Sequence, residues 1–124
     1  MDFLCKKYLS QMIQILHNAR CSKSRECLAF LDESKNEYEV IEYLKTPPTV
    51  EQLKEIIAKL GIKPIELIRR KEPLWIEKFE GKKHTPASLL KIMAKHPILI
   101  ERPIVVNGDR AIIARPPEKA ADII

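Results

Sequence analysis

Apolar and polar residues alternate over residues 11–17, and β-favouring residues are enriched over 38–44, so both segments are predicted to be strands. Between them, Ser24, Cys27 and Leu31 recur with helical spacing, which predicts a helix with one inward face. Because a helix connects the two strands, we expect them to lie parallel in one sheet.

A helical region is expected after the second strand. Thr49 and Gln52 have the spacing of a capping box, and the apolar pattern that follows stops at Gly61, a residue type suited to a helix end. Three further segments are expected before the next strand: a short helix over 64–70, an irregular stretch over 72–84, and a helix that begins at Thr85-Pro86 and stops at Pro97.

The strongest turn signal is Asn107-Gly108-Asp109, which lies between two apolar runs and predicts a β-hairpin. Pro116-Pro117 then leads into a short terminal helix. The order is a β-α-β unit, a helical insert over about 49–96, and a β-β-α unit. We therefore predict an α/β, thioredoxin-like fold with a mixed four-stranded sheet and the insert between strands 2 and 3.

Composition indicates one globular domain. The chain has 124 residues, 45% hydrophobic and 31% charged, a balance that excludes a disordered protein. No apolar run approaches the ~20 residues of a membrane helix, so no membrane association is expected. The net charge of +5 arises after Pro48, and its basic runs are too short for nucleic-acid binding; a small anionic substrate fits better.

The three cysteines, Cys5, Cys21 and Cys27, match no zinc-site spacing, so no metal is expected. Position 24 is Ser24, so Cys21 has no partner in a CxxC motif. An odd number of cysteines fits a reducing compartment, and a cytoplasmic location is predicted. Residues 1–11, which include Cys5, are expected to be a weakly ordered extension to a domain over 12–124.

Cys21 has the sequence context of a reactive thiol. It lies between a predicted strand and a predicted helix start, where unpaired backbone N–H groups stabilise an anion. Arg20, Lys23 and Arg25 add positive charge nearby. Cys27 belongs to the apolar helix face, and six helical residues place it ~9 Å from Cys21, too far for a disulfide.

Four further residues are candidates for the same site. His17 precedes Cys21 by four positions and is either a neutral structural histidine or a charge near the thiolate. Arg69, Arg102 and Arg115 each lie at the end of an expected element. They are either separate surface residues or, if one sheet edge gathers them, a guanidinium cluster for an oxyanion.

Four segments carry a resemblance to a known family: HNARCSKSR, YLKTPP, HPILIERPIVV and ARPPE. In this order and with these gaps, from about Met12 to Ile124, the sequence resembles the glutaredoxin-like arsenate reductases. The resemblance implies a thioredoxin-like fold in which Cys21 is the nucleophile and His17 is the loop histidine. Arg69, Arg102 and Arg115 are implied to bind the oxyanion. The resemblance also implies that Pro103 follows a cis peptide bond.

The resemblance further implies a reaction. The Cys21 thiolate attacks arsenate or a similar oxyanion, glutathione displaces the adduct as a mixed disulfide, and a glutaredoxin reduces that disulfide. Glutathione is a co-substrate, no cofactor is bound, and a monomer is expected. Two alternatives remain: a general glutathione-linked thiol oxidoreductase without arsenate activity, and a non-catalytic regulator that binds RNA polymerase. Ser24 argues against a dithiol sensor.

Overall fold

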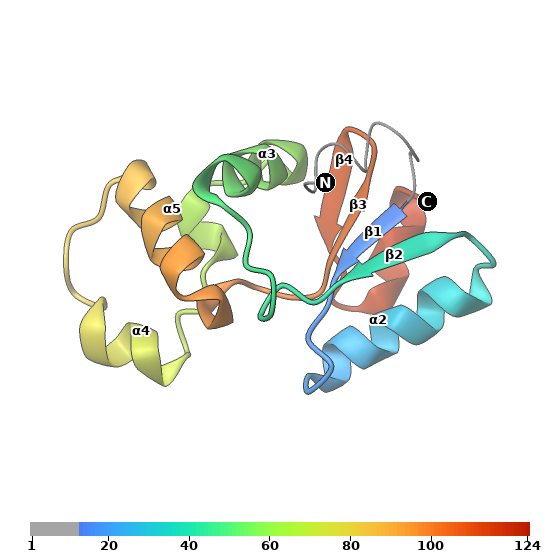
Figure 1. The fold of residues 1–124 in the computed structure, drawn as a ribbon, viewed down its shortest axis with the longest axis horizontal. Helices are drawn as coiled ribbons and strands as arrows, with labels where there is room; N and C mark the ends of the chain where they lie inside the picture. The colour runs from blue at the N-terminus through green and yellow to red at the C-terminus, as the bar shows by residue number, and fades with distance from the viewer. Residues whose placement is uncertain (1–12) are drawn as a thin grey trace.

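The computed structural model describes residues 13–124; the predicted extension over 1–11 and its Cys5 lie outside the described residues. A four-stranded sheet forms in the order β2-β1-β3-β4, with β1 parallel to β2 and the other pairs antiparallel (Figure 1). The predicted mixed sheet is thereby confirmed. Its strands are β1 (Ile13–Leu16), β2 (Tyr38–Ile41), β3 (Ile104–Asn107) and β4 (Arg110–Ile113).

Helix α2 (Ser22–Glu33) connects β1 to β2 and buries Ser24, Cys27 and Leu31, the face that the spacing predicted. It packs beside a terminal 3-10 helix, η3 (Pro117–Asp122). Together they cover one side of the sheet over a core of aliphatic residues and Cys27. The buried members are Ile13, Ile15, Cys27, Leu31, Val105, Ala114, Ala120 and Ile123.

The helical insert packs against a different set of sheet residues, among them Leu16, Ile104 and Val106. The insert contains α3 (Val50–Leu60), α4 (Pro73–Lys78) and α5 (Pro86–Lys95), and Figure 1 shows these helices gathered beside the sheet, away from α2. Helices α3 and α5 contact each other, and α3 also contacts β4.

Local sequence signals determine where the two main insert helices, α3 and α5, begin and where α3 ends. Thr49 and Gln52 form the predicted capping box: the Gln52 N–H donates to Thr49 Oγ1 at 3.2 Å, and the Thr49 N–H donates to Gln52 Oε1 at 2.9 Å. Gly61 ends α3 with a φ of 68°, a conformation that glycine adopts without a steric penalty. Thr85 caps α5, as predicted.

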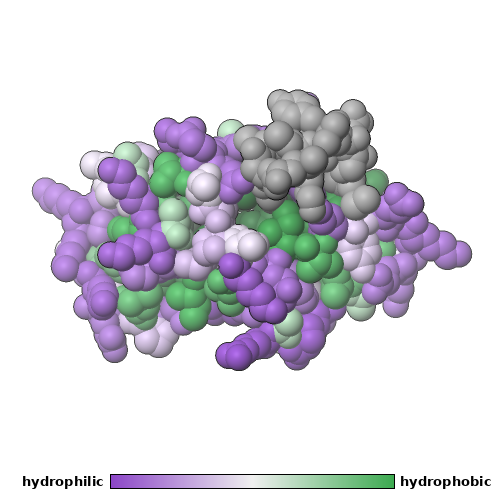
Figure 2. All heavy atoms as spheres, viewed as in Figure 1, coloured by the Kyte–Doolittle hydropathy of each residue, from purple (hydrophilic) through white to green (hydrophobic). Residues whose placement is uncertain are grey.

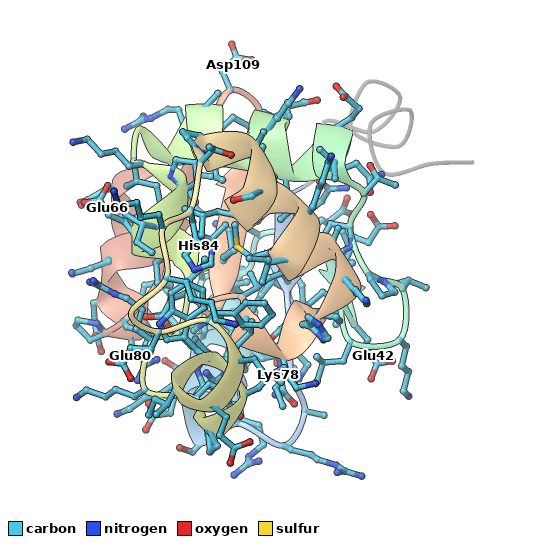
Figure 3. All side chains as sticks on the ribbon, turned by 90° about the vertical axis from the view of Figure 1, so that its left-hand side faces the viewer. Glu42, Glu66, Lys78, Glu80, His84 and Asp109 are labelled. Atoms are coloured by element: carbon cyan, nitrogen blue, oxygen red, sulfur yellow. The ribbon has the colours of Figure 1, made fainter. Side chains whose placement is uncertain are left out.

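One prediction for the insert was wrong. Residues 72–84 are not wholly irregular, because they contain helix α4 (Pro73–Lys78). The buried ring of Trp75 packs against those of Phe79 and His84, with centroids 5.6 Å and 5.3 Å apart. Figure 3 shows His84 inside the insert, between α4 and α5. Six residues are too few to display a helical period, so tertiary packing of the aromatic rings determines this helix.

Three expected elements are shorter or tighter than predicted. The helix over 64–70 is a 3-10 turn, η1 (Pro64–Leu67), because Ile68 forms a β-bridge with Ile100 instead of continuing it. The strand over 38–44 ends at Ile41, and the terminal helix is η3, a 3-10 helix. The hairpin is confirmed, and Asp109 lies at its exposed tip (Figure 3).

The sheet register determines which chain segments meet at one edge. Leu16 pairs with both Ile41 and Ile104, and Ile104 pairs with Ile113. The ends of β1, β2 and β4 and the start of β3 therefore lie side by side. The segments that leave or enter the sheet there contain nearly all the candidate site residues.

The face of the molecule shown in Figure 2 is largely polar. Hydrophilic side chains dominate both ends of the face shown in Figure 2, and apolar ones are seen nearer its middle. Among residues 13–124, no helix has the length and apolar character needed to cross a bilayer.

Candidate active site

The loop that carries Cys21 links β1 to α2 and is held by its own hydrogen bonds. The Cys21 N–H donates to the Asn18 carbonyl at 2.9 Å, and the Arg20 N–H donates to Asn18 Oδ1 at 3.0 Å. Arg25 Nη1 reaches back from α2 to the Ala19 carbonyl at 2.9 Å. Cys21 consequently occupies the position directly before the first residue of α2, where backbone N–H groups lack helical partners.

The surroundings of the Cys21 thiol favour its ionised form. Burial opposes ionisation, but the backbone amides of Ser24 and Lys23 at the start of α2 stabilise the thiolate. The positive charge of Arg102 acts in the same direction. These contributions exceed the cost of burial and hold the pKa of Cys21 below its ordinary value. Burial alone raises the pKa of Cys27 to about 11. Cys21 is thus the more acidic of these two thiols.

Ser24 occupies the position that a second cysteine would have in a CxxC motif. It is fully buried, and its Oγ accepts a long hydrogen bond from the Asn18 N–H at 3.4 Å. The side chain therefore supports the Cys21 loop and offers no sulfur. Within residues 13–124, no group of His, Cys, Asp and Glu side chains has the arrangement of a metal site.

Arg102 has free hydrogen-bond donors next to the thiol. Its Nε and Nη1 atoms are buried and have no hydrogen-bond partner within the described part of the chain. The Arg102-Pro103 peptide bond is cis, the isomer that the resemblance implied, and so is Arg115-Pro116. The Pro103 carbonyl accepts a hydrogen bond from the Ala114 N–H at 3.0 Å, which ties this segment to the end of β4.

Backbone pairing brings Arg69 from the insert to the same region. The Arg69 N–H donates to the Leu99 carbonyl at 2.7 Å, and the Glu101 N–H donates to the Leu67 carbonyl at 2.8 Å. These two bonds flank the bridge between Ile68 and Ile100. Arg69 is thereby placed beside the segment that leads into Arg102.

Arg69 and Arg115 meet at one carboxylate. Glu101 Oε1 lies 3.7 Å from Arg69 Nε and 3.7 Å from Arg115 Nη1. Arg69 Nη1 also pairs with Glu72 Oε2 at 2.8 Å. Burial raises the pKa of Glu101 above its ordinary value, and the charge of Arg115 counteracts this. Both arginines were predicted from the sequence, but Glu101 was not, because its only local signal is its position before Arg102.

Tyr43 interacts electrostatically with both Cys21 and Glu101, and it was not predicted from the sequence. Its phenol is 1% exposed, and burial, the Cys21 thiolate and Glu101 raise its pKa to about 12. Arg102 and the Asn18 side chain act in the opposite direction. The phenol thus lies within electrostatic range of the Cys21 thiol, the Arg102 guanidinium and the Glu101 carboxylate. No local pattern distinguishes this tyrosine from a core residue at a strand end.

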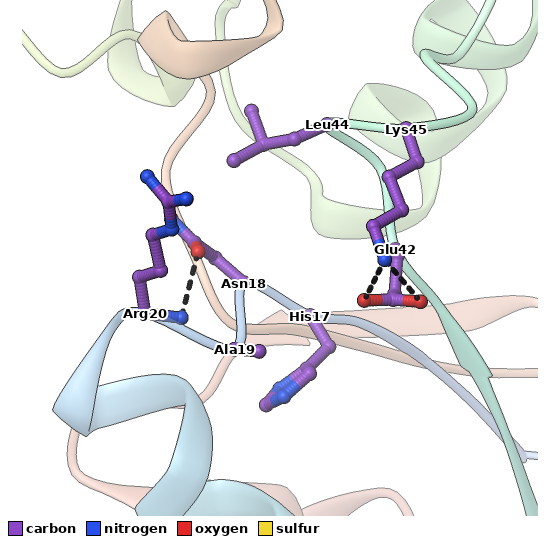
Figure 4. Close-up of a pocket in the computed structure, with 7 residues that line it drawn as sticks. All are labelled: His17, Asn18, Ala19, Arg20, Glu42, Leu44 and Lys45. Atoms are coloured by element: carbon purple, nitrogen blue, oxygen red, sulfur yellow. Dashed lines mark hydrogen bonds and ion pairs between the residues drawn. The ribbon is translucent and has the colours of Figure 1, made fainter.

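His17 lines a pocket formed by the loop that carries Cys21 and by the segment that follows β2. Burial lowers the pKa of His17 below its ordinary value, and Arg25 adds to this effect. The Glu42 carboxylate and a backbone hydrogen bond involving Ser24 oppose it. With 6% exposure, the ring is better suited to a neutral imidazole than to a second cation. The pocket in Figure 4 is lined by His17, Asn18, Ala19, Arg20, Glu42, Leu44 and Lys45.

The site therefore combines a stabilised thiolate, an arginine with unused donors and an arginine pair around a carboxylate. The family model of the ArsC family matches residues 16–123. The chain belongs to the ArsC family. That match includes His17, Cys21 and the three arginines at 69, 102 and 115.

Relatives of this ArsC-family chain match it over almost its full length. An arsenate reductase of Haemophilus influenzae is 43% identical over 113 residues, which cover 89% of this chain and 97% of the relative. The Escherichia coli protein YfgD is 40% identical over 118 residues, which cover 94% and 99%. The solved structure of an arsenate reductase from Vibrio cholerae superposes with a TM-score of 0.87 at 43% identity, covering 91% and 98%. The ArsC, thioredoxin-like fold is thereby shown.

Proposed function

We propose that this protein reduces arsenate to arsenite through a covalent adduct on Cys21. One observation carries the proposal: the buried Nε and Nη1 donors of Arg102 have no partner among the described residues, and this guanidinium faces the Cys21 thiolate. Buried donors without partners are costly to a protein and are typical of a site that binds a ligand. Relatives named arsenate reductase support arsenate as that ligand.

The oxyanion must approach a nucleophile that is itself negatively charged. Two unit charges ~4 Å apart repel by ~4 kcal/mol at an intermediate dielectric. The guanidinium of Arg102 offsets this repulsion, and its planar fork of donors can engage two oxygens of a tetrahedral anion. Backbone N–H groups at the start of α2 stabilise the same negative charge.

The reaction transfers one electron pair to arsenic. The Cys21 sulfur forms a bond to arsenic, and one arsenate oxygen takes up protons and leaves as water. A glutathione thiolate then attacks the Cys21 sulfur, and the S–As bond breaks with its electron pair remaining on arsenic, which is released as arsenite. Cys21 is left in a disulfide with glutathione.

A second thiol completes the cycle. The thiolate of a glutaredoxin attacks the glutathione sulfur, and the Cys21 thiolate leaves with the electron pair. Ser24 supports this external route, because no second cysteine follows Cys21 in a CxxC pair. Dependence on glutathione and a glutaredoxin belongs to a reducing, cytoplasmic setting. In this scheme the thiols supply the electrons, and neither a metal nor a bound cofactor takes part.

Purified protein with arsenate, glutathione and a glutaredoxin should form arsenite, and omission of either thiol component should stop turnover. Cys21→Ser should abolish arsenite formation. The control is Cys27→Ala, which removes a buried thiol with a raised pKa and should retain arsenite formation. Absence of arsenite with the complete wild-type mixture, or full activity of Cys21→Ser, would refute the proposal.

A further inference from the structure

Glu101 is a carboxylate placed among the arginines of the proposed oxyanion site. Its Oε1 atom lies 3.7 Å from both Arg69 Nε and Arg115 Nη1. The side chain is 30% exposed, so it lies at the surface of the site and not in the core. A carboxylate in this position partly neutralises two of the three guanidinium groups that an oxyanion would need.

Glu101 and the Cys21 thiol share two neighbours, Arg102 and Tyr43. Glu101 directly precedes Arg102, whose guanidinium stabilises the Cys21 thiolate. The buried Tyr43 phenol experiences the charges of Cys21, Arg102 and Glu101 together. An oxyanion bound by Arg102 and by the arginine pair would therefore have one of its oxygens next to the Glu101 carboxylate.

The oxyanion oxygen beside Glu101 would face a hydrogen-bond acceptor, the Glu101 carboxylate. An ionised carboxylate accepts hydrogen bonds and donates none, so it is favourable only to a ligand oxygen that carries a proton. Arsenate and phosphate keep at least one hydroxyl group at neutral pH, whereas sulfate keeps none. A bare oxygen facing Glu101 would leave two acceptors in contact without a hydrogen, which costs binding free energy.

We propose that Glu101 makes the site select oxyanions that carry a hydroxyl group over oxyanions that carry none. The hydroxyl donates a hydrogen bond to the Glu101 carboxylate, while Arg69 and Arg115 pair with the carboxylate and with the oxyanion. This inference rests on the proposed function, because it requires the oxyanion to bind beside Cys21. It assigns Glu101 to substrate specificity, as a ligand to the oxyanion and not as the nucleophile or its activator.

Protection of Cys21 from iodoacetamide gives a binding assay that needs no turnover. Hydrogen phosphate and sulfate are compared at mildly alkaline pH, where both are tetrahedral dianions and differ chiefly in the hydroxyl group. The wild-type protein should bind phosphate at least about tenfold more tightly than sulfate, the ratio expected for about 1.4 kcal/mol. Such a difference is within the cost of one unsatisfied polar group.

Glu101→Gln should remove most of this preference, since an amide can donate to a bare sulfate oxygen. Glu72→Gln is the matched control. It also removes a carboxylate paired with Arg69, so it should strengthen the binding of both anions while keeping their ratio. Glu101→Asp keeps the charge and withdraws the carboxylate by one methylene group, and it should reduce the preference as well.

Equal protection by phosphate and sulfate in the wild type would overturn the inference, and so would an unchanged ratio in Glu101→Gln or Glu101→Asp. If phosphate protects Cys21 and arsenite forms, such a result leaves the proposed function standing and removes only the role of Glu101. If neither anion protects Cys21 and no arsenite forms, the oxyanion site itself is refuted, and this inference fails with it.

Discussion

Replacement of Arg102 by alanine removes the guanidinium that we propose to bind the oxyanion beside the Cys21 thiolate. In the structure, the positive charge of Arg102 helps to lower the pKa of Cys21, and its Nε and Nη1 donors have no partner within residues 13–124. Arg69 and Arg115 cannot fully substitute for it, because both are already paired with Glu101. We therefore expect Arg102→Ala to impair both the nucleophile and substrate binding.

The expected loss follows from two contributions. A charge pair ~4 Å apart contributes ~4 kcal/mol at an intermediate dielectric. Loss of one preorganised donor from a site that stabilises negative charge costs ~2.7–4 kcal/mol in other enzymes. These figures describe overlapping effects, so we expect kcat/KM for arsenate to fall by ~100- to 1,000-fold. The free energy of unfolding should change by less than about 1 kcal/mol, because these donors stabilise no folded partner.

Arsenite formation gives the first measurement, and iodoacetamide labelling of Cys21 across pH gives the second. Since Arg102 lowers the pKa of Cys21, its removal should move the labelling midpoint to higher pH. Arg102→Lys should recover part of the midpoint shift but less of the activity, because an ammonium keeps the charge and lacks the fork. Arg110→Ala, an exposed arginine on β4, is the control. Full arsenate reduction by Arg102→Ala would show that Arg102 neither activates Cys21 nor binds the substrate.

Three further predictions concern the thiols, the N-terminal extension and the insert. Cys21 should react with iodoacetamide at lower pH than Cys27, whose pKa is about 11, and peptide mapping that finds faster reaction at Cys27 would contradict the assignment. A protein that begins at Met12 should fold and keep its activity, because the family motifs begin near there; loss of its thermal unfolding transition would show that residues 1–11 belong to the fold. Thr49→Ala should lower the free energy of unfolding by about 1 kcal/mol in a urea titration and leave kcat unchanged, since it removes the cap of α3 and no residue of the candidate site. An unaltered urea midpoint would contradict that value.

Much of the fold could be predicted because its signals are local. The capping pair of Thr49 and Gln52, the αL glycine at Gly61 and the turn at Gly108 each specify a backbone conformation within a few residues. Helix α4 could not be predicted, because its six residues are held by the packing of Trp75 against aromatic rings and not by a period. The early end of β2 at Ile41 likewise has no strong sequence signal.

The candidate site was predictable where a residue's role depends on its own element. Cys21 is such a case, since its thiol owes its low pKa to the start of α2 as well as to Arg102. Glu101 is the opposite case, because its partners Arg69 and Arg115 lie 32 residues before it and 14 after it. Only the bridge between the insert and the segment before β3 brings these three charges together. No pattern within a few residues of Glu101 records that arrangement.

We propose that Cys21 forms the covalent link in arsenate reduction. Mass spectrometry of the wild-type protein after a single turnover with arsenate and glutathione, in the absence of a glutaredoxin, tests this link. We expect one glutathione in disulfide linkage to Cys21, formed only when arsenate is present and in step with the release of arsenite. Arsenite released while Cys21 stays unmodified, or glutathione found on Cys27 instead, would contradict it.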